Sequence, residues 1–316
     1  MPFPVLARTL RGIEWIAGDE VRSRLGIETI DVGHRELRFS LRELAPGLVE
    51  LGTVDDVFLV LAEVDGLSRR RESLSRLASL SLDLEEIARL LGRDGPHTVG
   101  VTASFLGRRN YNRFELEDAV AAATDWAHVD RDGTLSLRVH VVDEVATVAV
   151  RIAPTPLHRR AYRVATVRGS VHPPLARALA LLAGRPFVDP FCGAGTIPIE
   201  GALAGLATRG SDTDPRAIEA ARLNAASAGV DVCFEPADAA SLGAVDCIVT
   251  NPPWGKAVPG TRVSLEAERL VLLTAEPTGL DHIVLEQTVR VHGALATITV
   301  VERPGPSAAA SSPTSP

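Results

Sequence analysis

The sequence predicts an α/β protein with more than one domain, whose C-terminal half contains a parallel sheet. From Val171 onward, short apolar strand segments alternate with helical segments, which is the pattern of parallel strands in one sheet. Before that point, a strand, a basic loop, a helix and a hairpin follow one another, which indicates a separate α+β module. The chain has 316 residues, which suits two or three domains that each bury a core.

The first elements are predicted from the spacing of apolar residues and from breaker residues. Gly12–Leu25 carries apolar residues at near-helical intervals, and Ile27–Phe39 has the character of a strand. Residues 66–95 are rich in Arg and Leu and are expected to be helical up to the breaker at Gly95-Pro96. The next three strands are Thr98–Phe105, Leu135–Val141 and Val145–Ile152, of which the last two predict a hairpin.

A basic loop, residues 107–114, follows the first of these three strands. It interleaves Arg108 and Arg109 with Tyr111 and Phe114, a combination that can contact phosphates and stack on bases. Both rings could equally lie in the core, with the arginines solvated. The sequence leaves these two interpretations open.

A second basic stretch lies between Glu144 and Asp189, where no acidic residue occurs. The net charge of −7 argues against a generally basic nucleic-acid binder, so a local concentration of arginines is informative. We expect Arg159, Arg160 and Arg163 to contact RNA phosphates. The alternative is a solvated linker without a ligand.

The C-terminal half is predicted to open with a helix from Pro173 that stops at Gly184. The strands that follow are expected at Phe187–Val188, Gly210–Asp212, Val230–Phe234, Val245–Thr250, Arg269–Thr274, Ile283–Val291 and Leu295–Glu302. The intervening helices are expected at Thr196–Ala204 and Pro215–Ala228, the second with Asp214 as N-cap and Gly229 as C-terminal stop. The last two strands form an antiparallel hairpin, which closes an otherwise parallel sheet.

A glycine-rich turn joins the first of these strands to the next helix. Gly193 and Gly195 would let the backbone approach a ligand, and the helix that starts at Thr196 favours an electronegative group at its N-terminus. A dinucleotide fingerprint would need a third glycine at position 198, where this chain has Pro198. The turn therefore predicts a nucleoside site without a pyrophosphate.

Two aspartates follow at the ends of the next strands. Asp212 lies 17 residues after Gly195 and ends the second strand, where a carboxylate can accept hydrogen bonds from both ribose hydroxyls. Asp238 follows the third strand and could receive an adenine amino group. Together with the glycine turn, they predict an adenosine-containing ligand.

The tetrapeptide Asn251-Pro252-Pro253-Trp254 ends the fourth strand and suits methyl transfer to an exocyclic amine. Such a nitrogen is a poor nucleophile because its lone pair is delocalised into the ring, so it has to be held in line with the methyl group. The Asn251 side-chain oxygen and the Pro252 carbonyl can accept hydrogen bonds from the NH₂ group, and Trp254 can stack on a base that has left its own stack.

These motifs resemble the class I methyltransferase domain of the THUMP-containing RNA guanine-N2 methyltransferases. The resemblance is carried by Asp189–Glu200, Gly210–Pro215 and Asn251–Gly255, and upstream by Pro156–Arg163, which is similar to the end of a THUMP domain. It implies a Rossmann-like fold that binds S-adenosylmethionine through Asp189, Phe191, Gly193, Gly195, Thr196, Asp212, Asp238 and Asn251. It also implies N2-methylation of a guanosine in tRNA.

The resemblance further implies a domain order. Residues 1–65 would form a ferredoxin-like domain, 66–155 a THUMP RNA-binding domain, 156–170 a basic linker and 171–303 the methyltransferase domain. The Pro/Ser/Ala-rich tail, 304–316, is predicted to be disordered.

One segment departs from the family pattern. Only Lys256–Glu268 separates the tetrapeptide from the next strand, with room for one or two helical turns at Val263–Glu268. This short segment leaves open a non-catalytic RNA-binding paralogue. A second alternative shares the C-terminal motifs: an Asn-Pro-Pro methyltransferase that acts on DNA adenine or protein glutamine.

Several other chemistries are not indicated. Cys192, Cys233 and Cys247 fit neither a disulfide framework nor paired metal ligands, and the eight histidines show no metal-binding spacing, so we expect no metal site. No stretch approaches the roughly 20 apolar residues of a membrane span, and residues 1–16 do not resemble a signal peptide. We expect a cytoplasmic protein without a membrane partner, and a monomer, although nothing in the sequence identifies the oligomeric state.

Overall fold

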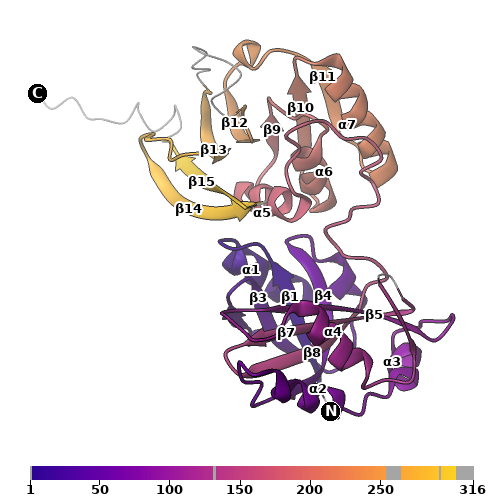
Figure 1. The fold of residues 1–316 in the computed structure, drawn as a ribbon. Helices are drawn as coiled ribbons and strands as arrows, with labels where there is room; N and C mark the ends of the chain where they lie inside the picture. The colour runs from indigo at the N-terminus through magenta and orange to yellow at the C-terminus, as the bar shows by residue number, and fades with distance from the viewer. Residues whose placement is uncertain (1, 131–132, 254–264, 292, 304–316) are drawn as a thin grey trace, which may run out of the picture.

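The computed structural model describes residues 2–130, 133–253, 265–291 and 293–303. The chain forms two bodies joined by the linker at residues 152–172 (Figure 1). In the described residues, the N-terminal body contains an eight-stranded sheet and the C-terminal body a seven-stranded sheet. The predicted α/β class with a mainly parallel C-terminal sheet is confirmed.

Strands and helices of the N-terminal body alternate irregularly. Its strands are β1 (Phe3–Thr9), β2 (Asp31–Gly33), β3 (Glu36–Leu41), β4 (Val54–Val64), β5 (Thr98–Phe105), β6 (Ala127–Val129), β7 (Leu135–Val142) and β8 (Val145–Arg151). Its helices are α1 (Glu14–Leu25), α2 (Ser75–Ala78), α3 (Leu84–Leu90) and α4 (Arg113–Ala121), with 3-10 turns η1 (Pro46–Glu50) and η2 (Arg71–Leu74). The predicted helical region 66–95 is thus three short helical pieces.

One sheet runs through both predicted N-terminal domains, in the order β2-β3-β1-β4-β8-β7-β5-β6. The long strand β4 pairs antiparallel with β1 on one side and with β8 on the other. Two hydrophobic cores nevertheless lie along this sheet: α1 packs on β1 and β3, and α4 packs on β5 and β7. The predicted boundary at residue 65 falls directly after β4, so it separates two cores within a single sheet.

The C-terminal body follows the predicted order of elements closely. Its strands are β9 (Phe187–Asp189), β10 (Thr208–Asp212), β11 (Cys233–Pro236), β12 (Val245–Thr250), β13 (Ala267–Thr274), β14 (Ile283–Val291) and β15 (Ala294–Glu302). Its helices are α5 (Pro173–Ala183), α6 (Thr196–Leu203) and α7 (Pro215–Ala228), with the 3-10 turn η3 (Ala239–Ser241). Asp214 caps α7, and Gly229 ends it at φ +67°, as predicted.

The C-terminal sheet has the order β11-β10-β9-β12-β13-β15-β14. The strands from β11 to β13 are parallel, whereas β15 is antiparallel to β13 and to β14. Chain order therefore reverses between β9 and β12, where the two strands lie side by side. In open α/β sheets, ligands bind in the crevice at the carboxyl ends of the strands at such a reversal.

The segment before β13 differs from the expectation. The first part of Val263–Glu268 lies outside the described residues, but Leu265 and Glu266 have no regular structure and β13 begins at Ala267. The expectation of helical turns is wrong for this described part. Pairing with β12 from Val245 to Thr250 draws Ala267 and Glu268 into the strand instead.

The two bodies contact each other through the start of α1. Leu10, Ile13 and Ile16 belong to the same buried cluster as Leu175 and Leu179 of α5. Because these side chains are nearly fully buried, this contact fixes the N-terminal body against the helix that precedes β9. None of the helices in the described residues is long and apolar enough to cross a membrane.

Candidate active site

The loop between β9 and α6 carries the two predicted glycines in left-handed backbone conformations. Gly193 has φ +53° and Gly195 has φ +79°, a region that favours glycine. A Cβ at Gly195 would lie 2.8 Å from Cζ of Phe234, so this glycine is required by close packing on β11. A Cβ at Gly193 would make only an ordinary contact, 3.4 Å from Val167. Gly193 is therefore the glycine that leaves room for a ligand.

Asp212 at the end of β10 holds this loop. One carboxylate oxygen accepts a hydrogen bond from the Gly193 N–H at 3.0 Å, and the other accepts one from the Asp214 N–H at 2.9 Å. An ionised carboxylate has about four acceptor positions, so Asp212 keeps acceptor capacity for ribose hydroxyls. Asp214 serves instead as the predicted cap of α7, and it also pairs with Arg216.

Asp189 ties the glycine loop to the end of β12. Its Oδ1 accepts hydrogen bonds from the Phe191 N–H at 3.1 Å and from the Thr250 hydroxyl at 2.6 Å. Its Oδ2 is buried and has no hydrogen-bond partner among the described residues. Burial raises the pKa of Asp189 to about 7, although the two hydrogen bonds act in the opposite direction. An unpartnered buried oxygen is costly, and a polar ligand group at the site would relieve that cost.

Asn251 follows β12 at the same edge of the sheet. Its side-chain Oδ1 is buried and also has no partner among the described residues. Because β10, β9 and β12 are neighbours, their carboxyl ends bring Asp212, Asp189 and Asn251 to one edge. Pro252 follows half-buried and Pro253 exposed, and Trp254 lies outside the described residues.

The other predicted cofactor residues surround this edge. Thr196 is buried at the start of α6, and Phe191 is half-buried in the loop. Asp238 lies just beyond the carboxyl end of β11, exposed, and its side chain accepts the Ala240 N–H at 2.9 Å to cap η3. Burial raises the pKa of the Cys192 thiol, and the charges of Asp189 and Asp212 raise it further, so this thiol is not a thiolate nucleophile.

The arginines predicted to bind RNA have different environments. Arg108 is exposed, whereas Arg109 donates hydrogen bonds to the carbonyls of Leu67 and Asp143 and so holds two loops together. In the same loop, Tyr111 is buried against Phe105. Phe114 is 57% exposed, with the Arg113 guanidinium 4.6 Å from its ring centroid. One ring is therefore core and the other is free for stacking.

The linker arginines also divide into two kinds. Arg160 donates to Oε1 of Glu200 at 2.7 Å and to the Gly52 carbonyl at 2.6 Å, and it bonds the Leu157 carbonyl as well. Each of its three guanidinium nitrogens thus makes a contact within the protein. Arg159 is exposed and Arg163 half-buried, and neither has an acidic partner among the described residues.

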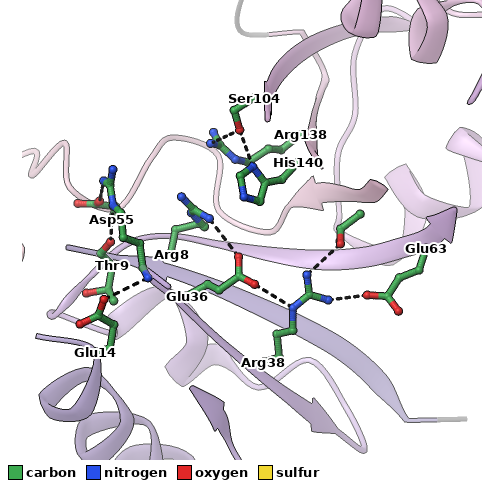
Figure 2. Close-up of polar contacts among 12 residues, drawn as sticks. Arg8, Thr9, Glu14, Glu36, Arg38, Asp55, Glu63, Ser104, Arg138 and His140 are labelled. Atoms are coloured by element: carbon green, nitrogen blue, oxygen red, sulfur yellow. Dashed lines mark hydrogen bonds and ion pairs between the residues drawn. The ribbon is translucent and has the colours of Figure 1, made fainter. Parts of the chain in front are cut away.

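A polar network on the N-terminal sheet has no counterpart in the sequence predictions. Alternate residues of β7 enter the core, whereas Arg138 and His140 point to the opposite face. Figure 2 shows them grouped with Ser104, beside a chain of contacts that runs from Arg8 through Glu36 to Arg38. The Ser104 hydroxyl lies 2.8 Å from Nδ1 of His140 and 3.3 Å from a terminal nitrogen of Arg138.

This network concentrates positive charge in a poorly solvated place. Burial and, after it, the charge of Arg8 lower the pKa of Arg138 to about 10 and that of His140 to about 4. Nε of Arg138 is buried and without a partner among the described residues. The sequence showed only the polar side of a strand with clean alternation. Its neighbours come from other strands: Ser104 lies on β5, and Arg8 and Glu36 lie on β1 and β3, about a hundred or more positions earlier.

Comparisons with known proteins match this chain to methyltransferases. Residues 160–270 match the model of the RMKL-like methyltransferase domain family. The chain is 32% identical, over 267 residues, to the tRNA (guanine(6)-N2)-methyltransferase of Thermus thermophilus, a match that covers 79% of this chain and 78% of that protein.

Solved structures show the same fold along nearly the whole chain. The crystal structure of TrmN from Thermus thermophilus superposes with a TM-score of 0.78 at 25% identity, covering 96% of this chain and all of that one. A protein of Clostridium difficile 630, described as a possible methylase, superposes with a TM-score of 0.74 at 20% identity, covering 97% and 99% of the two chains. The second likeness shows the fold alone. Because the identity to the first relative extends over more than two thirds of both proteins, the chain belongs to the methyltransferase family that contains the Thermus thermophilus tRNA (guanine(6)-N2)-methyltransferase.

Proposed function

We propose that this protein transfers the methyl group of S-adenosylmethionine to the N2 amine of a guanosine in tRNA. The observation that carries the proposal is the buried, unpartnered Oδ1 of Asn251 at the carboxyl end of β12, beside Asp189 and the glycine loop. A buried acceptor without a donor is suited to an incoming NH₂ group.

The residues at the sheet edge fit the methyl donor. Asp212 keeps free acceptor positions for the ribose hydroxyls, Gly193 leaves space above the loop, and the start of α6 favours the carboxylate. Phe191 and Asp238 flank the place for the adenine ring in this proposal. When bound, S-adenosylmethionine supplies an electrophilic methyl group on a positively charged sulfur.

Asn251 and Pro252 then orient the amine. Hydrogen bonds from the NH₂ group to the Asn251 Oδ1 and the Pro252 carbonyl would favour a more tetrahedral nitrogen and aim its lone pair at the methyl carbon. The amine nitrogen would form the new bond to the methyl carbon, the electron pair of the C–S bond would stay on the sulfur of the product, and the nitrogen would lose one proton to water. The positive charge of the sulfonium would pass to the nitrogen and be lost with its proton, so the transfer requires neither a metal nor a covalent intermediate on the protein.

The N-terminal body would hold the RNA. We assign residues 1–65 to a ferredoxin-like domain and 66–155 to a THUMP domain, and the separate cores on either side of β4 support that division. The exposed Arg108 and Phe114 are available for RNA, and we place the activity in the cytoplasm, where tRNA is found.

A methyl-transfer assay tests the function directly. With tritiated methyl donor and tRNA transcripts, the wild type should form N2-methylguanosine. At saturating cofactor, Asn251→Ala should turn over about 10²-fold more slowly, because positioning and a transition-state hydrogen bond are lost. Transfer at the wild-type rate by Asn251→Ala would sink this mechanism.

The same assay separates the alternatives. Methylation of duplex DNA or of a protein amide, with none on tRNA, would contradict the RNA substrate. Tight cofactor binding without transfer to any substrate would identify a non-catalytic paralogue. The short segment before β13 would then be the first place to look for the cause of the lost activity.

A further inference from the structure

A pocket of about 480 Å³ lies in the linker between the two bodies. Its lining consists of three arginines, two histidines and two hydroxyl residues, and contains no acidic residue. The volume is within the range of ligand pockets, about 300–1,000 Å³. A wall of this composition attracts an anion with several oxygen atoms.

Two of the arginines in this lining are free to meet such an anion. Arg160 is held by Glu200 and Gly52, and His172 lies with Nε2 2.7 Å from the Asp55 carboxylate, so these residues build the wall. Arg159 and Arg163 have no acidic partner in the part of the chain that the structure describes. Two uncompensated guanidinium groups on a fixed wall suit a phosphate, whose oxygens they can contact by paired hydrogen bonds.

The wall is rigid because it is anchored in both bodies. Glu200 is fully buried and accepts hydrogen bonds from Arg160, Arg177 and the Tyr162 hydroxyl. Burial raises the pKa of Tyr162, which keeps the hydroxyl protonated as a donor. The backbone that carries Arg159 and Arg163 is therefore held in place without a ligand, which lowers the cost of ordering it on binding.

The same linker stretch is bonded to the glycine loop. The Ala165 N–H and carbonyl both pair with the Asn224 side chain at 2.9 Å, and the Asn224 amide also donates to the Ala194 carbonyl at 3.0 Å. Ala165 lies between Arg163 and Thr166, which both line the pocket. A group seated in the pocket is thus fixed relative to the loop that carries the cofactor site.

We propose that this pocket binds a backbone phosphate of the RNA substrate through Arg159 and Arg163, and so sets the register of the RNA on the methyltransferase domain. The inference rests on the proposed function, since it takes the substrate to be RNA. Arg160 contributes to the wall and is not a ligand.

The test compares two double variants with the same loss of charge. Arg159→Ala with Arg163→Ala removes the two free pocket cations, whereas Arg168→Ala with Arg209→Ala removes two exposed arginines outside the pocket. Binding of a tRNA transcript is measured over a range of salt concentrations, together with cofactor affinity and the kcat and KM of methyl transfer.

The pocket variant should bind tRNA about tenfold more weakly near 0.1 M salt, and its slope of log K against log salt should be less steep by about 0.9, the contribution of one lost phosphate contact. KM for tRNA should rise while cofactor affinity stays unchanged. The slope of the control variant should match the wild-type slope to within about 0.5.

Equal affinities and equal slopes in the two variants would overturn the proposal. If inorganic phosphate alone stabilised the wild type against heat, but not the pocket variant, while both bound tRNA equally, the ligand would be a free anion and the RNA assignment would fall. If the wild type methylated no RNA yet bound it through these arginines, the phosphate site would stand and the proposed activity would fail.

Discussion

Each carboxylate oxygen of Asp212 accepts a hydrogen bond from a backbone N–H, one from Gly193 in the glycine loop and one from Asp214. Asp212→Asn keeps the size of the side chain but removes the charge and replaces one acceptor with a donor. We expect the affinity for S-adenosylmethionine to fall by about 1.5–3 kcal/mol, the usual cost of losing a hydrogen bond to a charged group.

Calorimetry with purified protein measures this change, and Asp214→Asn is the matched control. Asp214 caps α7 and pairs with Arg216 at the surface, so its substitution should leave cofactor affinity within about twofold. Equal affinity in the two variants and the wild type would remove Asp212 from the cofactor site.

His140 gives the protein a dependence of stability on pH. Burial lowers its pKa in the folded state to about 4, whereas in the unfolded chain the pKa has its ordinary value of about 6.5. As pH falls through 6.5, His140 binds a proton in the unfolded chain but not in the folded protein, where it is protonated only near pH 4. Stability is therefore lost between about pH 6.5 and pH 4. Between pH 7.5 and pH 5, this amounts to about 2 kcal/mol.

His140→Gln should remove that part of the pH dependence, because glutamine does not titrate and can still bond Ser104. Urea unfolding of both proteins at pH 7.5 and pH 5 measures the difference. The aspartates with raised pKa values, Asp56 and Asp189, act in the opposite direction but are present in both proteins. An identical loss of stability on acidification in the two would contradict this role of His140.

The residues of the site differ in how far their roles follow from sequence. Asp189, Asp212 and Asn251 each end a strand of a parallel sheet, and the regular alternation of strands and helices predicts that such ends share one edge. The roles of Arg109 and Arg160 could not be predicted, because their partners lie far away in sequence, at Leu67, Gly52 and Glu200. Local patterns carry no information about those contacts.

Helix α6 carries the residue that joins the two bodies. Glu200 accepts from Arg160 of the linker at 2.7 Å and from Arg177 of α5 at 3.1 Å. A Cβ at Gly52 would lie only 2.1 Å from Nε of Arg177, so glycine is needed there for the arginine to pass. This buried cluster connects the N-terminal sheet, the linker and the helix that follows the cofactor loop.

Glu200→Gln should therefore destabilise the protein by about 3–5 kcal/mol, because it leaves two arginines buried without a negative charge. Glu219→Gln on the exposed side of α7 makes the same chemical change and should cost less than about 0.5 kcal/mol. Urea unfolding measures both. Equal stability of the two variants would show that this cluster does not stabilise the fold.

The elements themselves illustrate what local sequence determines. Helix α7 was predicted with its observed bounds because a cap at Asp214 and a stop at Gly229 are both local signals. The three-residue strand β6 was missed, since it is held only by its parallel pairing with β5. Likewise, β4 and β8 are separated by some eighty residues, so their union into one sheet could not be read from either segment.

In the molecule as a whole, the N-terminal body, which is proposed to bind RNA, is held in a fixed orientation relative to the C-terminal methyltransferase body. Leu10 and Ile13 enter the C-terminal core, Glu200 holds the linker, and Asn224 connects that linker to the glycine loop. An RNA bound across the junction would therefore meet the cofactor edge in a defined orientation, which is what selection of one nucleotide requires.

Nucleoside mass spectrometry of tRNA from a deletion strain, beside its parent, tests the central claim in the cell. The account predicts that N2-methylguanosine in tRNA falls in the deletion strain, that the wild-type gene restores it, and that a gene carrying Asn251→Ala does not. An unchanged level of N2-methylguanosine in the deletion strain, in the absence of a second enzyme with the same activity in its extract, would contradict the account.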